Sequence, residues 1–157
     1  DIGFSKSEIG TVVKFFVLFA TLIGAFIGGL LSLKIGLYRS LMIFGIFQAI
    51  ATLGFSILAY FGNSLYLLMI VISLENLAAG MGYTAYLAFI ANMTNKRFTA
   101  TQFALMTALM SLPRTLFSGM SGYLVEMLDW ELYFIFCSLI AFPALIILIK
   151  LRRSLKI

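Results

Sequence analysis

The fold class is decided by the stretch LMIFGIFQAIATLGFSILAY, residues 41–60, which contains no charged side chain. A helix of this length is about 30 Å long, which matches the hydrocarbon thickness of a bilayer. Its apolar residues do not alternate with polar ones, as they would in a strand of an outer-membrane barrel. Because a helix satisfies its own backbone hydrogen bonds, which lipid cannot do, the stretch predicts a transmembrane helix.

Five apolar segments of this kind divide the chain. Their expected limits lie near residues 11–33, 40–61, 65–91, 100–125 and 132–149. The 157 residues are 62% hydrophobic and 11% charged, whereas charged residues make up about a quarter of a water-soluble domain. We therefore expect an all-α, polytopic membrane protein with five transmembrane helices.

The composition also excludes several kinds of chemistry. The chain has no histidine, and Cys137 is its single cysteine, so neither a His/Cys metal site nor a Ser-His-Asp catalytic set can form. The basic residues lie in short gaps between apolar segments instead of clustering on one solvated face, which argues against nucleic-acid binding. We expect no metal, no cofactor and no enzymatic activity, and we expect the lipid bilayer as a partner.

The charges in the gaps predict the orientation. Basic residues occur in the first gap, in the third gap and in the tail: Lys34, Arg39, Lys96, Arg97, Lys150, Arg152, Arg153 and Lys156. The second gap is uncharged, and the fourth holds only acidic residues. Because lysine and arginine stay on the cytoplasmic side, the carboxy terminus is expected to be cytoplasmic and residue 1 external. An external start without a signal peptide, at an aspartate, suggests a piece of a longer chain.

Three charged residues fall inside the predicted spans, namely Lys14, Glu75 and Arg114. Glu75 and Arg114 lie at similar depths, about 15 and 16 Å from the external side. They either form a buried pair that specifies packing, or face a water-filled cavity where Arg114 holds an anionic group and Glu75 binds a proton. Pro113 predicts a kink beside Arg114. Lys14, about 5 Å deep, can instead snorkel to the interface.

Polar and small residues predict helix contacts as well. Gln48 is expected to hydrogen-bond between helices. Small residues recur at helical spacing on one face of the first segment and of the fourth: Ala20, Gly24, Gly28 and Ser32, then Ala104, Ala108, Ser111, Thr115, Gly119 and Gly122. Such a stripe lets another helix approach closely. It is either ordinary packing within one bundle or a sliding surface between two halves of a transporter.

Residues 28–39 resemble the loop signature of the major facilitator superfamily, Gly-x-x-x-Asp-Arg-x-Gly-x-Arg. The acidic residue is absent, because Ser32 and Leu33 occupy that region, and this departure fits the weaker copy in the second half of such proteins. The loss leaves the loop without its charge relay. The resemblance assigns a gating loop to Gly29, Lys34, Gly36 and Arg39.

Other stretches closely resemble the muropeptide permeases of the AmpG type. They are Glu75-Asn76, residues 80–82, residues 97–105 and Leu112-Pro113-Arg114, together with the opening residues 1–10. The resemblance implies a bacterial inner-membrane permease that imports anhydro-muropeptides by proton symport, with these helices as numbers eight to twelve of two six-helix bundles. The partner is then the amino-terminal bundle of the permease, absent from residues 1–157.

We assign substrate binding to Lys14, Asn76 and Arg114, and proton coupling to Glu75. Transport would proceed by alternating access, with two bundles rocking around a site at the midplane. Two other interpretations stay open. The chain is a non-functional gene remnant, or it comes from a related transporter such as an acetyl-coenzyme A transporter.

Overall fold

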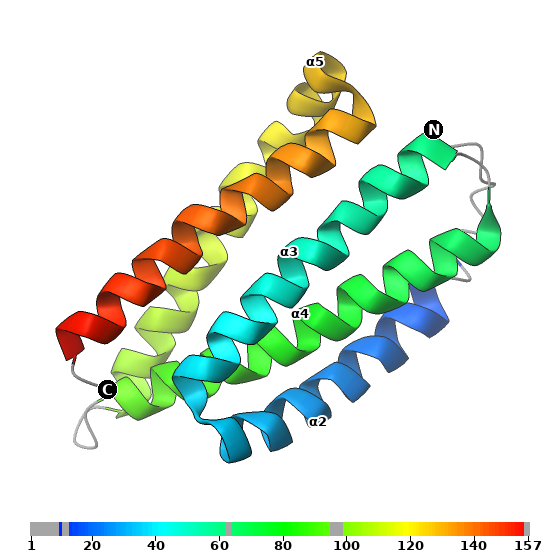
Figure 1. Ribbon diagram of the computed structural model, residues 1–157. Helices are drawn as coiled ribbons and strands as arrows, with labels where there is room; N and C mark the ends of the chain where they lie inside the picture. Colours follow the sequence, from blue (N-terminus) through cyan, green and yellow to red (C-terminus); the bar gives the residue numbers. More distant parts are fainter. Residues whose placement is uncertain (1–9, 11–12, 62–63, 95–98, 156–157) are drawn as a thin grey trace.

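The computed structural model describes residues 10, 13–61, 64–94 and 99–155. A short π-helix, η1 (Val13–Val17), leads into α2 (Leu18–Ile35), which is followed by α3 (Leu37–Phe61), α4 (Leu65–Met93) and α5 (Thr99–Leu155). No strand occurs among these residues. Figure 1 shows the long helices gathered into one bundle, and the predicted all-α class is confirmed.

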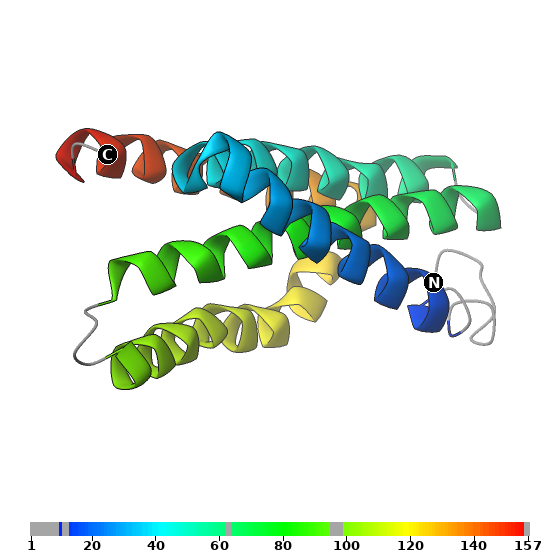
Figure 2. The same cartoon turned by 90° about the horizontal axis from the view of Figure 1, so that it is seen from below.

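Helix α5 consists of two helices joined at Asp129. This residue has φ 61° and ψ 163°, the one non-helical conformation inside α5. The chain reverses there, at the upper end of the bundle in Figure 1, and Figure 2 shows the two arms diverging from that end. We call residues 99–128 the first arm and residues 130–155 the second arm. The break falls at Asp129 in the acidic gap, whereas the backbone stays helical through Pro113.

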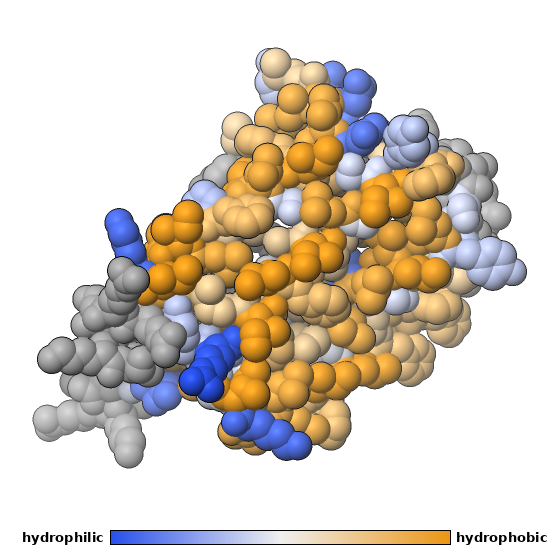
Figure 3. Space-filling view, viewed as in Figure 1, coloured by the Kyte–Doolittle hydropathy of each residue, from blue (hydrophilic) through white to orange (hydrophobic). Residues whose placement is uncertain are grey.

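The outer surface of the bundle is apolar. Four stretches are long and apolar enough to cross a membrane: Lys14–Ile35, Leu37–Phe61, Tyr66–Met93 and Ser118–Lys150. The last of these contains the reversal at Asp129, and its second-arm part alone spans about 30 Å. Figure 3 shows apolar side chains over the middle of the bundle and hydrophilic ones toward its ends. Large side chains such as Phe26 (70% exposed) and Leu33 (86%) face outward, as expected in contact with lipid.

Helices α2 and α4 pack with their backbones nearly touching. A Cβ added to Gly28 would lie 2.6 Å from Cα of Met81, and one on Gly24 would collide with the Leu77 carbonyl. Ala20, Gly24, Gly28 and Ser32 are all buried. The close approach predicted for this stripe is confirmed. Its partner is α4 of the same chain, so the alternative of a sliding surface between two halves is wrong for this stripe.

Helix α3 packs on the other side of α4 and carries the second arm. Phe44 and Leu58 of α3, each 1% exposed, belong to two apolar clusters that also contain α4 residues. Phe55 stacks on Phe134 of the second arm with ring centroids 5.0 Å apart. Ser138 of that arm donates a buried hydrogen bond to the Ala49 carbonyl at 2.9 Å.

The first arm is attached differently. Figure 2 shows it at the edge of the bundle. Every member of its small-residue stripe is exposed, and a Cβ added to Gly119 or Gly122 would have no neighbour within 4 Å. Packing within one bundle was one of the two interpretations of this stripe. Among the described residues, no helix packs against the small-residue stripe of the first arm.

Candidate functional site

A polar cluster lies between α3 and α4, within the apolar stretch Tyr66–Met93. Glu75 follows Leu65, the first residue of α4, by ten positions, which corresponds to about 15 Å along the helix. Gln48 Nε2 donates a hydrogen bond of 2.5 Å to Oε1 of Glu75. The Thr52 hydroxyl lies 3.3 and 3.2 Å from the two carboxylate oxygens. Both donors belong to α3, so the carboxylate is directed toward that helix.

The cluster holds a carboxylate with neutral donors. A charged side chain near the bilayer centre is costly unless it is solvated or paired, and hydrogen bonds to a carboxylate are stronger than bonds between neutral groups. The Thr52 hydroxyl also lies 3.0 Å from the Gln48 carbonyl oxygen, so its single hydrogen has competing acceptors. The amide oxygen Oε1 of Gln48 is buried without a hydrogen-bond partner. The cluster of Glu75, Gln48 and Thr52 therefore contains one ionisable group, the Glu75 carboxylate, and one unused hydrogen-bond acceptor, the Gln48 amide oxygen.

The interhelical role predicted for Gln48 is confirmed, while Thr52 was missed. Thr52 follows Gln48 by four residues, and residues at this spacing share one face of a helix. That spacing was a signal in the sequence that could have found it. Pairing of Glu75 with Arg114 stays a prediction, because the Arg114 side chain lies outside the described ones.

The remaining candidate residues, Asn76 and Lys14, are not part of the cluster around Glu75. Asn76 Nδ2 donates to the Ile72 carbonyl of its own helix at 2.9 Å, and its side chain is half-buried. Lys14 lies in η1 and is exposed. No hydrogen bond among the described residues links either side chain to Glu75. Their role in substrate binding stays a prediction.

The expected gating loop forms a tight turn between α2 and α3. Gly36 has φ 86°, a backbone conformation that glycine adopts readily. The carbonyl of Gly36 accepts hydrogen bonds from the backbone N–H and the hydroxyl of Ser40 at 3.0 and 2.9 Å. Lys34 and Arg39 are exposed on either side of the turn. The structure thus brings together Lys34, Gly36 and Arg39, while Gly29 lies further back in α2.

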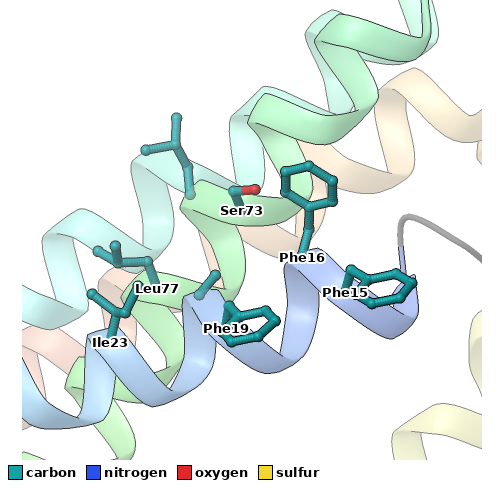
Figure 4. A pocket seen from close by; sticks show the side chains of 8 residues that line it. Phe15, Phe16, Phe19, Ile23, Ser73 and Leu77 are labelled. Carbon is teal, nitrogen blue, oxygen red and sulfur yellow. The ribbon is translucent and has the colours of Figure 1, made fainter.

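An apolar cavity opens where α2 begins, against the middle of α4. Figure 4 shows Phe15, Phe16 and Phe19 around it, facing Ser73 and Leu77 of α4. Its volume is about 350 Å³. Because its walls are almost entirely aromatic and aliphatic, this cavity suits an apolar group and not the charged portion of a substrate.

The sequence profile of the Major Facilitator Superfamily matches residues 1–156. The chain belongs to this superfamily. AmpG 4 of Rickettsia felis is 38% identical over 157 residues, which is 100% of this chain and 38% of that protein. The anhydromuropeptide permease of Escherichia coli is 37% identical over 155 residues, covering 99% of this chain and 32% of the permease. AmpG 1 of Rickettsia prowazekii is 34% identical over 155 residues, covering 99% and 35%.

The similarity to AmpG-named proteins confirms the resemblance found in the sequence. This membrane-embedded, helical member of a transporter superfamily spans only 32–38% of the length of these relatives. Its family and its permease-named relatives point to a transport protein and not to an enzyme.

Proposed function

We propose that the chain is the carboxy-terminal part of a permease that imports anhydromuropeptides together with protons, by alternating access. The observation that carries the coupling mechanism is the Glu75 carboxylate, placed at mid-depth and hydrogen-bonded by Gln48 and Thr52. The whole-chain similarity to a named anhydromuropeptide permease supports the substrate class. The five helices then correspond to helices eight to twelve of the complete fold, in the bacterial inner membrane.

Glu75 carries the coupled proton in this mechanism. As a carboxylate it accepts hydrogen bonds from α3, and protonation removes the charge that makes those bonds strong. A proton from the external side would therefore loosen the contact between α3 and α4, and its release to the cytoplasm would restore it. The α3–α4 contact is formed when the substrate site faces one side of the membrane and loosened when the site faces the other side.

The substrate contacts are assigned to Arg114, Lys14 and Asn76. An arginine holds a carboxylate through two parallel hydrogen bonds, and this geometry suits the peptide part of a muropeptide. The turn that contains Lys34, Gly36 and Arg39, with Gly29 behind it, gates the cytoplasmic side against the amino-terminal bundle. The carboxy terminus is cytoplasmic in this arrangement, in line with the basic tail.

The coupling role is tested by Glu75→Gln in vesicles that contain this chain assembled with the amino-terminal bundle of a related permease. The variant should lose accumulation of anhydromuropeptide against a gradient while keeping exchange, because exchange does not require release of the proton. Glu126→Gln, which removes a carboxylate from the acidic gap, should leave both measurements unchanged. Proton-driven accumulation by Glu75→Gln would overturn the coupling role.

The substrate role of Arg114 is tested in the same vesicles. Arg114→Lys keeps the charge but cannot form the two parallel bonds, so uptake should fall by about tenfold or more. Normal uptake would leave packing as the role of Arg114. Absence of uptake by the unaltered assembly, with both parts inserted, would favour the gene-remnant interpretation. Uptake of acetyl-coenzyme A in place of muropeptide would favour the related transporter.

The orientation is tested with single cysteines at Asn63 and Arg97 in a Cys137→Ser background. A membrane-impermeant thiol reagent applied to intact cells should label position 63 and spare position 97. The reverse pattern would overturn the orientation.

A further inference from the structure

The Thr52 hydroxyl lies between acceptors on two helices, and its one hydrogen can serve only one helix at a time. Its oxygen is 3.0 Å from the carbonyl oxygen of Gln48, on its own helix α3. The two carboxyl oxygens of Glu75, on α4, lie 3.3 and 3.2 Å away. A hydroxyl group also carries two lone pairs that accept hydrogen bonds. Thr52 can therefore meet Glu75 as a donor or, while its hydrogen is on the Gln48 carbonyl, as an acceptor.

The contact within α3 is the shorter of the two. Threonine inside a helix commonly donates to the carbonyl four residues earlier, and the contact of Thr52 with the Gln48 carbonyl has this spacing. A hydroxyl bonded in this way has only lone pairs left for Glu75. Lone pairs repel an ionised carboxylate, whereas a protonated carboxyl group offers them a hydrogen. The geometry thus suits the protonated form of Glu75 as well as the ionised one.

A protonated Glu75 needs an acceptor for its own hydrogen, because polar groups inside proteins are nearly always hydrogen-bonded. Gln48 Nε2 donates to Oε1 of Glu75 at 2.5 Å, which leaves Oε2 to carry the proton. The amide nitrogen cannot accept, and the Gln48 amide oxygen could serve only if the amide turned its N–H away from Oε1. Among the described residues bonded to Glu75, the acceptor is therefore Thr52, at 3.2 Å from Oε2.

We propose that the Thr52 hydroxyl reverses its hydrogen bond with Glu75 when the carboxyl group takes up a proton. It donates to the ionised carboxylate. In the protonated state it accepts from the O–H on Oε2 and donates its own hydrogen to the Gln48 carbonyl, while Gln48 Nε2 stays on Oε1. Rotation about the Cβ–Oγ1 bond of Thr52 is sufficient, and the proton on Glu75 is the only hydrogen gained.

This inference rests on the proposed role of Glu75 in proton coupling and adds Thr52 to it as a positioning residue. Hydrogen bonds between neutral groups are weaker than bonds to a carboxylate, so protonation still loosens the contact between α3 and α4. The reversal leaves no hydrogen of the cluster unpaired, and unpaired polar groups are costly inside a membrane. Both protonation states are thereby accommodated at one site.

The charged groups on the elements packed against α4 are the same in every variant of Thr52. These elements are η1, α2, α3 and α5. Lys34 and Arg39 lie at the turn between α2 and α3, Lys14 is exposed in η1, and Arg114, Tyr133 and Cys137 lie on the two arms of α5. A difference between variants at position 52 therefore cannot come from these groups.

Infrared difference spectroscopy of the chain in phosphatidylcholine vesicles tests the reversal. Acidification produces the C=O band of the protonated Glu75 carboxyl group, which is identified by its loss in Glu75→Gln. Thr52→Val keeps the branched shape but removes the acceptor, so the band should move to higher wavenumber. Thr52→Ser keeps a hydroxyl and should leave the band in place.

Thr84→Val is the matched control. The Thr84 hydroxyl donates to the Gly80 carbonyl of its own helix at 3.0 Å, four residues earlier, as Thr52 does with Gln48. Its removal should leave the Glu75 band unchanged. An unaltered amide I band in each variant verifies that the helices are folded.

A carbon-13 label on the backbone carbonyls of glutamine follows the other half of the reversal. The sequence contains two glutamines, Gln48 and Gln102. The Gln48 carbonyl gains the Thr52 hydrogen when Glu75 is protonated, so its band should move to lower wavenumber on acidification. This shift should be absent in Thr52→Val and in Glu75→Gln.

Two results would overturn the proposal. A Glu75 band that stays in place in Thr52→Val would mean that the acid donates to another acceptor. A Gln48 carbonyl band that stays fixed while Glu75 titrates would mean that the Thr52 hydroxyl keeps one partner in both states. Both bands are measured without substrate, so proton-driven accumulation by Glu75→Gln would overturn the coupling role and leave the reversal standing.

Discussion

The two small-residue stripes of this chain have the same sequence character and opposite surroundings. On α2, Gly24 and Gly28 lie against the backbone of α4. On the first arm of α5, Gly119 and Gly122 have no neighbour within 4 Å of an added Cβ. The difference teaches that such a stripe marks a surface suited to close approach but does not choose the partner.

The partner helix accounts for the difference. Helix α4 meets the α2 stripe with a small residue of its own, because a Cβ on Gly80 would collide with the backbone of α2. Two narrow surfaces can interlock, and van der Waals contact then holds the helices together in lipid. No described helix offers such a surface to the first arm. We expect its partner in the amino-terminal bundle of the proposed permease.

The largest expected effect contrasts the two stripes directly. Gly28→Leu places a side chain where the backbone of Met81 lies, so it should reduce the free energy of unfolding by about 3 kcal/mol or more. Gly119→Leu meets open space and should change it by less than about 0.5 kcal/mol. Unfolding by a denaturing detergent, followed by circular dichroism, gives both values. Similar losses in the two variants would contradict the assigned packing.

The next prediction concerns the partner of the first arm. Expressed alone, the chain should be degraded rapidly, because the exposed stripe marks it as incompletely assembled. Co-expression with an amino-terminal bundle from a related permease should lengthen its half-life several-fold, as measured by pulse–chase labelling. Gly119→Leu should remove this protection although it is harmless to the isolated chain. Equal half-lives with and without the partner would argue against the half-transporter.

A smaller effect is expected at the polar contact between α3 and α4. Gln48→Leu removes one donor to Glu75, and interhelical hydrogen bonds in membranes are worth about 0.6 kcal/mol on average, up to about 1.7. Because this acceptor is a carboxylate, a double-mutant cycle between Gln48→Leu and Glu75→Leu should give a coupling near the upper value. Thr52→Val should cost less, since its hydroxyl has an alternative acceptor. A coupling of zero would mean that the contact contributes nothing.

The smallest expected effect compares the two arms of α5. Ser138→Ala removes the buried bond to Ala49 and should cost about 0.6 kcal/mol. Among the described residues, the Ser118 hydroxyl donates only to the Thr115 carbonyl of its own helix, at 2.9 Å. Ser118→Ala should therefore be neutral within the error of the same unfolding measurement. A greater loss for Ser118→Ala would show that the first arm is held more firmly than its exposed surface implies.

The sequence by itself determined the helical class, the place of the reversal in the acidic gap and the glycine at the α2–α3 turn. Each of these follows from local chemistry: the length of an apolar run, a break in hydropathy, or the freedom of Gly36 to adopt a positive φ. Gln48 could also be predicted as an interhelical residue, because an amide inside a membrane has few other partners.

Only the tertiary structure decided which faces meet. In lipid a helix is apolar on all sides, so the hydrophobic pattern that orients a helix in a soluble protein carries little information. Nothing local distinguishes the α2 stripe from that of the first arm, or directs Glu75 toward α3. Those outcomes depend on the shapes and polar groups that the other helices present, because close packing and interhelical hydrogen bonds are what hold helices together in a membrane.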